Sequence, residues 1–283
     1  MSSNAALQRV KRLYGAAKAG HTGSLDPLAT GMLPLCFGAA TRIGSYLLNA
    51  HKTYEVGAKL GVATDTGDAE GTIIREEPDV VPSAAAVTDV LQRFEGTIEQ
   101  VPPMYSALKR GGVPLYRLAR RGIEVPRSPR RVVIDSIDLV SYRWPDLRFV
   151  LRCSKGTYVR SLVSDLAEAL GSCGHVSELR RLSVEPFEGA RMHTLDELEE
   201  VSKTTGLEGL DRLLLPLDRA LPDWPELVID AALAERLLHG QSIAGDSSWP
   251  RGLVRVYAFP RTFLAIGEVS AEGVLAPKRV FAP

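Results

Sequence analysis

The sequence contains few residues that could build a disulfide framework or a metal centre. Three cysteines occur in 283 residues, an odd number, and they are not spaced as pairs of metal ligands. They are Cys36, Cys153 and Cys173. The five histidines are scattered along the sequence. Free thiols in a reducing compartment therefore fit better than disulfides or a zinc site, and we expect no bound metal.

Long apolar runs are also missing. No hydrophobic stretch approaches the length that spans a bilayer, and the N-terminus has no apolar core typical of a signal peptide. Hydrophobic residues make up 45% and charged residues 24% of the sequence, which are ordinary values for a globular protein with a sizeable core. We therefore expect a cytoplasmic protein without a membrane partner, built as one large domain or as a large and a small one.

The net charge of zero hides an uneven distribution of charge along the sequence. Residues 1–60 carry seven Lys or Arg against two acids, and residues 108–160 carry thirteen against four. The segments 61–107 and 161–250 are acidic. Two basic segments could form one positive face that attracts phosphates, whereas a mixed, solvated surface is an equally good alternative. Charge alone does not decide between them.

A glycine-framed loop over residues 20–31 contains a single carboxylate, Asp26. Its three glycines can adopt positive φ or admit a close backbone approach, and Pro27 directly follows the aspartate. Asp before Pro is also typical of a helix start, with Asp as the N-cap and Pro at the first helical position. The loop therefore predicts a presented acid, a helix cap at Asp26, or both together.

Residues 102–131 combine prolines, paired glycines, aromatics and a dense run of arginines. This composition is typical of a basic surface excursion rather than of a core element, although a solvated helix over 115–121 would explain part of it. Arginine and aromatic side chains together suit contacts with RNA phosphates and unstacked bases. The basic residues that we single out here are Lys109, Arg110, Arg120 and Arg121.

Hydrophobic periodicity predicts a chain that mixes helices with strands. The predicted helices cover 4–14, 40–48, 84–94, the stretch from Arg160 to Leu170, and much of 196–221. The predicted strands cover 33–37, 52–61, 132–140, 148–153 and 179–182, with shorter ones over 253–257, 263–268 and 274–281. Pro222, Trp224 and Pro225 mark a boundary before a small C-terminal β domain.

A polar loop over residues 64–71 contains three acids between glycines. Its spacing is superficially that of a calcium loop, but the terminal bidentate glutamate of that motif is missing. We therefore do not expect a cation in this loop.

Three motifs resemble those of one family. Gly20–Gly31 resembles the catalytic loop G-H-x-G-x-L-D-P-x-A-x-G of the TruB family, the bacterial tRNA pseudouridine synthases that act on uridine 55 of the T loop. Ser154–Arg160 resembles the family motif S-K-G-T-Y-x-R, and residues 64–71 resemble its T-D-T-x-D-x-x-G segment. The resemblance covers nearly the whole chain. It implies an isomerase that binds the tRNA T stem-loop, flips out the target uridine and needs no cofactor or metal.

The resemblance also implies roles for particular residues. Asp26 matches the catalytic nucleophile, and Arg160 matches an arginine that would keep the aspartate ionised after burial. Without the motif, Arg160 would be a surface residue of a helix. Tyr54 matches a tyrosine that stacks on the target base, although the sequence alone equally predicts an aromatic of a half-buried strand. The residues that match positions contacting RNA or lining the uracil pocket are His21, Tyr158 and Leu179.

The fold implied by the resemblance is α+β, with a mixed, largely antiparallel pseudouridine-synthase sheet, flanking helices and a thumb-like RNA-binding insertion over residues 102–131. Residues 1–221 would form the catalytic domain, and residues 222–283 a small PUA-like RNA-binding β domain. We expect a monomer with tRNA as its partner.

The sequence departs from the family pattern at its front. Family members usually begin with a further apolar strand and a D-K-P-x-G turn, and residues 1–4 begin where that turn ends. A lost strand would leave a sheet partner unpaired. An alternative function is therefore a tRNA-binding or folding factor with weak or no catalysis.

Overall fold

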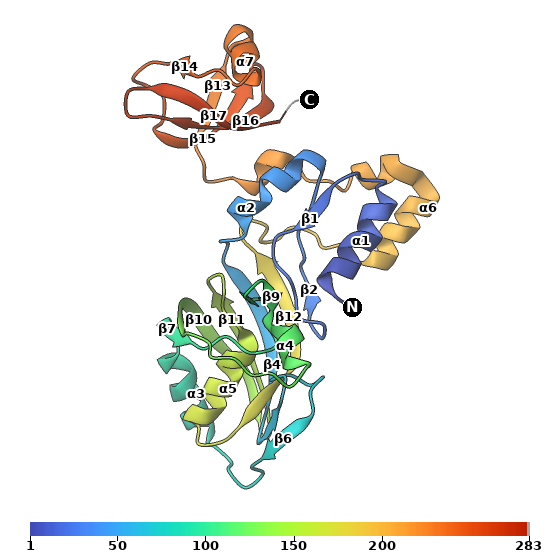
Figure 1. Ribbon diagram of the computed structural model, residues 1–283, viewed down its shortest axis with the longest axis vertical. Coiled ribbons are helices and arrows are strands. Elements are labelled where there is room, and N and C mark those ends of the chain that lie inside the picture. Colours follow the sequence, from blue (N-terminus) through green and yellow to red (C-terminus); the bar gives the residue numbers. More distant parts are fainter. Residues whose placement is uncertain (282–283) are drawn as a thin grey trace. The chain divides into compact units, whose positions relative to one another are not determined.

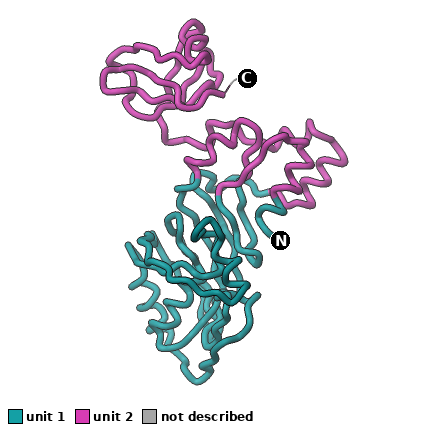
Figure 2. The backbone as a smooth tube through the Cα atoms, viewed as in Figure 1, with its two compact units in different colours: residues 1–6, 23–34, 48–192 teal, residues 7–22, 35–47, 193–283 magenta. Residues whose placement is uncertain are grey.

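The chain forms two compact units, which Figure 2 shows in different colours on the computed structural model. The structure describes residues 1–281. The first unit comprises Met1–Ala6, Gly23–Pro34 and Leu48–Met192, and the second comprises Leu7–Thr22, Leu35–Leu47 and His193–Pro283. Each unit therefore combines separated parts of the sequence, and the domains 1–221 and 222–283 stay a prediction.

A six-stranded sheet forms the centre of the first unit, with the strand order β2-β12-β4-β11-β10-β7 (Figure 1). Its strands are β2 (Thr30–Gly31), β12 (Gly174–Val184), β4 (Lys52–Leu60), β11 (Asp146–Cys153), β10 (Arg130–Arg143) and β7 (Gly96–Gln100). β2 pairs with β12 in parallel, and the other pairs in this order are antiparallel. The predicted mixed, largely antiparallel sheet is confirmed.

The β4 strand confirms the half-buried strand predicted over 52–61. Tyr54, Val56, Ala58 and Leu60 are buried, whereas Thr53, Glu55 and Lys59 between them are partly or fully exposed. Gly57 is buried as well, because it has no side chain to reach the solvent. One face of this strand therefore packs in the core, and the other carries polar side chains.

Two helices, α3 (Ala84–Arg93) and α5 (Val159–Ala169), contribute their apolar residues to the core of the first unit. From α5 these are Leu162, Val163 and Leu166, which recur at the spacing that places side chains on one helix face. They join Phe149 of β11 in a single buried cluster. Because Arg160 is the second residue of α5, this packing also determines where the Arg160 side chain starts.

Two small hairpins extend from the first unit. β5 (Val62–Thr64) and β6 (Ile73–Glu76) flank the acidic loop, while β8 (Lys109–Arg110) and β9 (Val113–Pro114) lie within the basic insertion. After β9 comes a short helix, α4 (Leu115–Ala119), which confirms the predicted surface helix but ends two residues earlier than expected. The last two residues of the insertion, Arg130 and Arg131, belong to β10 instead.

The second unit begins within the first helix and contains mostly short elements. They are α1 (Ser3–Leu13), β1 (Ala19–His21), β3 (Leu35–Phe37), a 3-10 helix over Gly38–Arg42, α2 (Gly44–Leu47), α6 (Leu195–Asp211) and a 3-10 helix over Leu217–Ala220. The single helix predicted over 40–48 is wrong, because a 3-10 turn and a four-residue helix take its place. The long acidic helix is interrupted as well, because Gly206 adopts a φ of 65°.

The C-terminal part of the second unit is a five-stranded sheet with the order β13-β15-β16-β17-β14. Its strands are β13 (Glu226–Ile229), β14 (Ile243–Ala244), β15 (Gly252–Ala258), β16 (Thr262–Val269) and β17 (Val274–Val280). The three predicted strands correspond to β15, β16 and β17, so the small β domain is confirmed. The helix α7 (Ala231–Leu238) was not predicted; Asp230 caps it by accepting from the Leu233 N–H.

Across residues 1–281, none of the helices combines the length and apolar character needed to cross a membrane.

Asp165 on α5 is a partly buried carboxylate, and burial together with Glu168 raises its pKa to about 6. Because its ordinary pKa is 3.8, the carboxylate costs the fold no stability well below that pH, where it is protonated in both states. Stability then falls as the pH rises from 3.8 to about 6. We expect Asp165→Asn to stabilise the protein at pH 7.5 by about 1 kcal/mol after discounting for partial exposure, with most of that gain lost at pH 4.

Urea unfolding at the two pH values measures this difference. Glu168→Gln is the matched control, since it removes a neighbouring exposed carboxylate and only the smaller contribution to the Asp165 pKa. An Asp165→Asn gain that is equal at both pH values would contradict the assignment.

Candidate functional site

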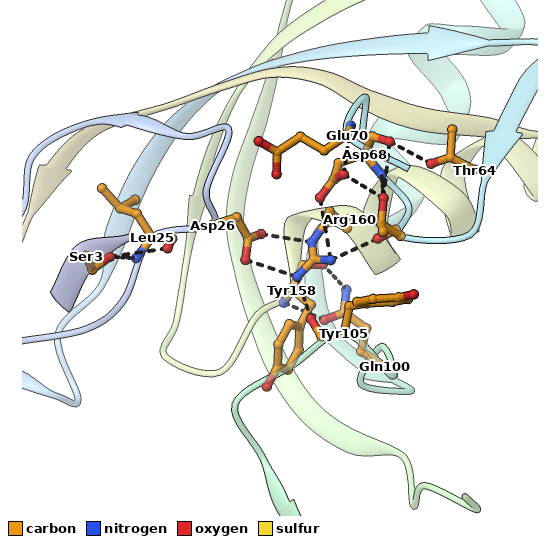
Figure 3. A network of polar contacts seen from close by, with 11 residues as sticks. Ser3, Leu25, Asp26, Thr64, Asp68, Glu70, Gln100, Tyr105, Tyr158 and Arg160 are labelled. Carbon is orange, nitrogen blue, oxygen red and sulfur yellow. Dashed lines mark hydrogen bonds and ion pairs between the residues drawn. The ribbon is translucent and has the colours of Figure 1, made fainter. Parts of the chain in front are cut away.

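Asp26 and Arg160 form a bidentate ion pair, although 134 positions separate them (Figure 3). The Arg160 Nε donates to Asp26 Oδ2 at 2.8 Å, and its Nη2 donates to Oδ1 at 3.0 Å. The Arg160 side chain is 6% exposed and that of Asp26 is 34% exposed. The guanidinium is therefore enclosed, while the carboxylate keeps an open face. The structure brings together these two residues that the sequence assigned to catalysis.

The remaining donors of Arg160 are also used. Nη1 donates to the Thr66 carbonyl and Nη2 donates to the Tyr105 carbonyl, each at 2.8 Å. A second carboxylate, Asp68, lies 3.6 Å from Nη1 and is 4% exposed. Two carboxylates and two carbonyls thus surround one buried cation, which offsets the cost of removing its charge from water.

The loop that contains Asp68 is built to hold this carboxylate. Asp68 Oδ1 accepts from the Thr66 hydroxyl at 2.6 Å and from the Glu70 N–H at 3.1 Å. The Ala69 N–H donates to the Val176 carbonyl of β12, which ties the loop to the sheet. The acidic loop noted in the sequence therefore supports Arg160. In the described part of the chain, no group of three or more His, Cys, Asp or Glu residues could hold a metal ion.

The chain around Asp26 is a turn. The Ala29 N–H donates to the Asp26 carbonyl at 2.9 Å, and no helix begins at Pro27, so the predicted helix cap is wrong. The physical reason is that both side-chain oxygens of Asp26 accept from Arg160, a charged donor that forms stronger bonds than a backbone N–H. Just before Asp26, the Leu25 N–H and carbonyl both bond to the Ser3 hydroxyl.

Tyr54 lies on β4 and is 8% exposed. Burial raises the pKa of its phenol to about 12; the nearby Asp26 charge adds a little to this rise, and Arg181 opposes it. The phenol is therefore a neutral hydrogen-bond donor at physiological pH. Tyr54 also belongs to the main apolar cluster together with Leu179, which is 6% exposed on β12. These two residues offer an apolar surface on the sheet that carries the site.

Tyr158 immediately precedes α5 and is held by Gln100 at the end of β7. The Gln100 Oε1 accepts from the Tyr158 N–H at 2.8 Å, and its Nε2 donates to the Tyr158 carbonyl at 3.1 Å. Burial raises the pKa of the Tyr158 phenol above its ordinary value. This double contact fixes the backbone two residues before Arg160, so the first turn of α5 has a defined position.

The other predicted RNA-contacting residues lie outside this network. His21 ends β1 in the second unit, where it pairs with Leu35 of β3. The four basic residues of the insertion are exposed. Among them, Arg110 donates to the Pro126 carbonyl at 3.0 Å, and the Arg120 guanidinium lies 5.6 Å from the centre of the Tyr116 ring.

Three residues of the site were not predicted from the sequence: Asp68, Gln100 and Arg181. Arg181 is 1% exposed on β12 and donates to the carbonyls of Met32 and Gly23, which flank Asp26 in the chain. β12 also carries Glu178 and Arg180, so the only available signal for Arg181 was its place two positions after the apolar Leu179, on the same face of the strand. Gln100 gave no such signal, because a polar residue at a strand end is common.

The arrangement presents one ionised carboxylate beside an apolar surface with a buried aromatic ring. A neighbouring arginine favours the charged form of an aspartate, and such a carboxylate can act as a nucleophile or a base. The open face of Asp26 and the neutral phenol of Tyr54 suit a planar, uncharged ring as substrate.

Comparisons with known proteins match nearly the whole sequence to one family. The family model described as "TruB family pseudouridylate synthase (N terminal domain)" matches residues 11–159. The model "tRNA pseudouridylate synthase B C-terminal domain" matches residues 160–222, and "Pseudouridine synthase II TruB, C-terminal" matches residues 225–281. The three matches together cover more than nine-tenths of the sequence and include every residue of the Asp26–Arg160 network.

Among curated relatives, the chain is 50% identical over 279 residues to the tRNA pseudouridine synthase B of Ectopseudomonas mendocina, covering 99% of this chain and 91% of that protein. It is 49% identical over 280 residues to the protein of that name from Pseudomonas aeruginosa, with coverages of 99% and 92%. Among solved structures, a Cbf5-Nop10-Gar1 complex contains a chain with a TM-score of 0.74 and 26% identity, covering 100% of this chain and 82% of that one.

We expect Asp68→Asn to lower the free energy of unfolding by about 2 kcal/mol, because it removes a buried charge 3.6 Å from Arg160. The asparagine still offers an oxygen to Thr66 and Glu70. Asp65→Asn is the matched control, since Asp65 accepts a backbone N–H in the same loop but is exposed. Urea unfolding of the two variants measures the difference, and equal losses would contradict a specific role for Asp68.

Proposed function

The chain belongs to the TruB family of pseudouridylate synthases, and we propose that it converts a uridine of tRNA into pseudouridine with Asp26 as the nucleophile. The observation that carries the assignment of Asp26 is its bidentate pair with the buried Arg160, at 2.8 and 3.0 Å. Relatives that are 50% and 49% identical to this chain are named tRNA pseudouridine synthase B, which supports tRNA as the substrate.

The reaction is an isomerisation in which atoms and electrons balance without a co-reactant. The bond between ribose C1′ and uracil N1 breaks, and the detached base turns. A bond then forms between C1′ and C5, the C5 proton leaves and N1 gains one. A nucleophilic carboxylate can hold the sugar or the base while the glycosidic bond is broken. Asp26 is suited to this step because Arg160 holds both of its oxygens while one face of the carboxylate stays open.

Tyr54 is proposed to stack on the target base. Its ring belongs to the buried apolar cluster, and its raised pKa keeps the phenol neutral, so it offers a hydrogen-bond donor and an aromatic face rather than a base. Leu179 supplies further apolar surface, and Tyr158 stands at the start of α5 beside the backbone that positions Arg160. An apolar pocket of this kind excludes water from the detached base.

We infer that the substrate base is uridine 55 of the T loop and that it reaches Asp26 by flipping out of the RNA stack. The similarity of residues 20–31 to the family loop supports this position. Lys109, Arg110, Arg120 and Arg121 are exposed cations suited to the phosphates of the T stem-loop. The start of the same insertion contacts the site, because the Tyr105 carbonyl accepts from Arg160.

The remaining assignments follow from the same substrate. We propose that residues 222–283 form an additional RNA-binding domain, that His21 contacts the opened T loop, and that the enzyme acts as a monomer in the cytoplasm, where tRNA is processed.

Asp26→Asn is expected to lower the single-turnover rate of pseudouridine formation by roughly 10⁴-fold or more, because the amide cannot act as a nucleophile. Mapping of pseudouridine in unmodified tRNA measures the product, and filter binding measures tRNA affinity, which should change little. Asp65→Asn is the control carboxylate outside the Arg160 network. Product formed by Asp26→Asn at the wild-type rate would contradict the nucleophile, and a wild-type protein that binds tRNA without product would favour a folding factor.

The double variant Arg120→Gln/Arg121→Gln is expected to weaken tRNA binding and to reduce the slope of log K against log salt concentration by about 1.4 to 1.8, since each lost phosphate contact removes about 0.7 to 0.9. Dissociation constants measured at several salt concentrations between about 50 and 200 mM give this slope. Arg93→Gln/Arg212→Gln is the control for loss of two exposed cations outside the insertion and outside residues 222–283. An unchanged slope in the first variant would exclude these arginines from the RNA contact.

A further inference from the structure

Arg181 is a buried cation without an acidic partner. Its residue is 1% exposed, the lowest exposure of any arginine among the buried residues, and within residues 1–281 no carboxylate lies at ion-pair distance from it. Burying an unpaired charge is costly, so other groups must offset the loss of water. At this exposure Arg181 cannot itself bind RNA phosphates, and its charge must act inside the protein.

The groups that offset this cost are backbone carbonyls at the two ends of one segment. Arg181 Nε donates to the Met32 carbonyl at 2.6 Å, and its Nη2 donates to the Gly23 carbonyl at 3.2 Å. The segment between them, residues 23–32, contains Asp26. One planar guanidinium thus joins both ends of the loop that carries the proposed nucleophile, a geometry for which the donor fork of arginine is suited.

The backbone adds a contact at the C-terminal end of the loop. The Met32 N–H donates to the Arg181 carbonyl at 2.8 Å, and Gly31 pairs with Arg181 in the short parallel ladder of β2 and β12. Gly31 has a φ of +96°, and a Cβ there would overlap the Arg181 carbonyl, so this close approach requires glycine. Near the other end, Gly23 has its contact with the Arg181 side chain, and Leu25 is held by Ser3.

Arg181 also lies beside Tyr54. The two residues are directly opposite each other in the antiparallel pairing of β12 with β4. Burial raises the pKa of the Tyr54 phenol, and the Arg181 charge opposes this rise. Burial and, to a smaller extent, the Arg181 charge lower the pKa of Lys52, which lies on β4 as Tyr54 does. The guanidinium therefore stands between the loop of Asp26 and the strand that carries the stacking tyrosine.

We propose that Arg181 is a positioning residue of the reaction: its guanidinium ties both ends of loop 23–32 to the sheet, and so holds Asp26 at Arg160 and beside Tyr54. Arg181 does not touch the reacting atoms. The structural part of this inference stands on the contacts alone, whereas its effect on rate rests on the function proposed above.

Amide hydrogen exchange of the ligand-free protein tests the clamp without any reference to activity. We expect Arg181→Met to speed exchange in residues 23–32 by about tenfold or more, because that segment opens more often once its tie to Arg181 is lost. Arg181→Lys keeps the charge but cannot span both carbonyls, so its exchange should be intermediate. Arg148→Met, which removes a partly exposed cation of β11 that pairs with Glu55 and Glu178 outside the loop, should leave exchange within about twofold of wild type. Unchanged exchange in Arg181→Met overturns the proposal.

Single-turnover kinetics with saturating tRNA test the consequence. A shift of the loop by about 1 Å should lower the rate by about 100-fold in Arg181→Met, while the tRNA dissociation constant changes by less than about threefold. Arg181→Lys should recover part of the rate. A rate loss matched by an equal loss of affinity in both variants overturns the proposal, because that marks a general folding role. Melting temperatures show whether each variant folds. If Arg181→Met does not fold, the rate and tRNA affinity of Arg181→Lys test the proposal instead.

The exchange and kinetic experiments distinguish failure of this inference from failure of the proposed function. If the wild-type protein forms no pseudouridine in tRNA, the proposed function fails, and the exchange experiment still decides whether Arg181 clamps the loop. If the wild type is active and Asp26→Asn is not, a fully active Arg181→Met overturns the inference alone.

Discussion

The Arg160 guanidinium joins four separated segments of the first unit. It extends from α5, pairs with Asp26, reaches Thr66 and Asp68 in the acidic loop, and donates to the Tyr105 carbonyl. A buried guanidinium has five N–H donors in a fixed plane, and each donor left without an acceptor costs free energy. All four segments must therefore be in place together. The same contacts that close the fold here also fix the position of the Asp26 carboxylate.

The central sheet holds the loops that carry the functional residues. Val176 and Arg181 on β12 hold the acidic loop and the loop of Asp26, respectively, and Tyr54 lies on the adjacent strand β4. Both strands are covered by α5 through a single apolar cluster. Functional groups on loops thus gain precise positions because each loop is tied to a strand in the core. This division between a packed frame and tethered loops is suited to a site that must admit a bulky RNA.

Particular residues show how far the sequence could predict this arrangement. Asp26, Arg160 and Tyr54 followed from motif resemblance, and the structure places Asp26 and Arg160 in direct contact. The longer strands and most of the longer helices followed from periodicity, but short strands such as β1, β2 and β7 did not. The helix expected at Pro27 is absent because the Asp26 side chain has a stronger partner in Arg160. Periodicity reads only local spacing, so it could not anticipate a partner 134 positions away.

The sequence by itself determined the chemistry of this protein: which side chains carry charge, where glycines permit close approach, and which apolar residues recur at helical or strand spacing. Only the tertiary structure decided the partners of those charges. Asp68 acts through the distant Arg160 side chain. Gln100 and Arg181 act through contacts with backbone groups of distant segments, and Arg181 in particular binds two carbonyls rather than an acid. Every residue has a backbone carbonyl, so the sequence does not indicate which carbonyls will accept hydrogen bonds from a buried cation. That choice is made when the strands pair and the loops close over them.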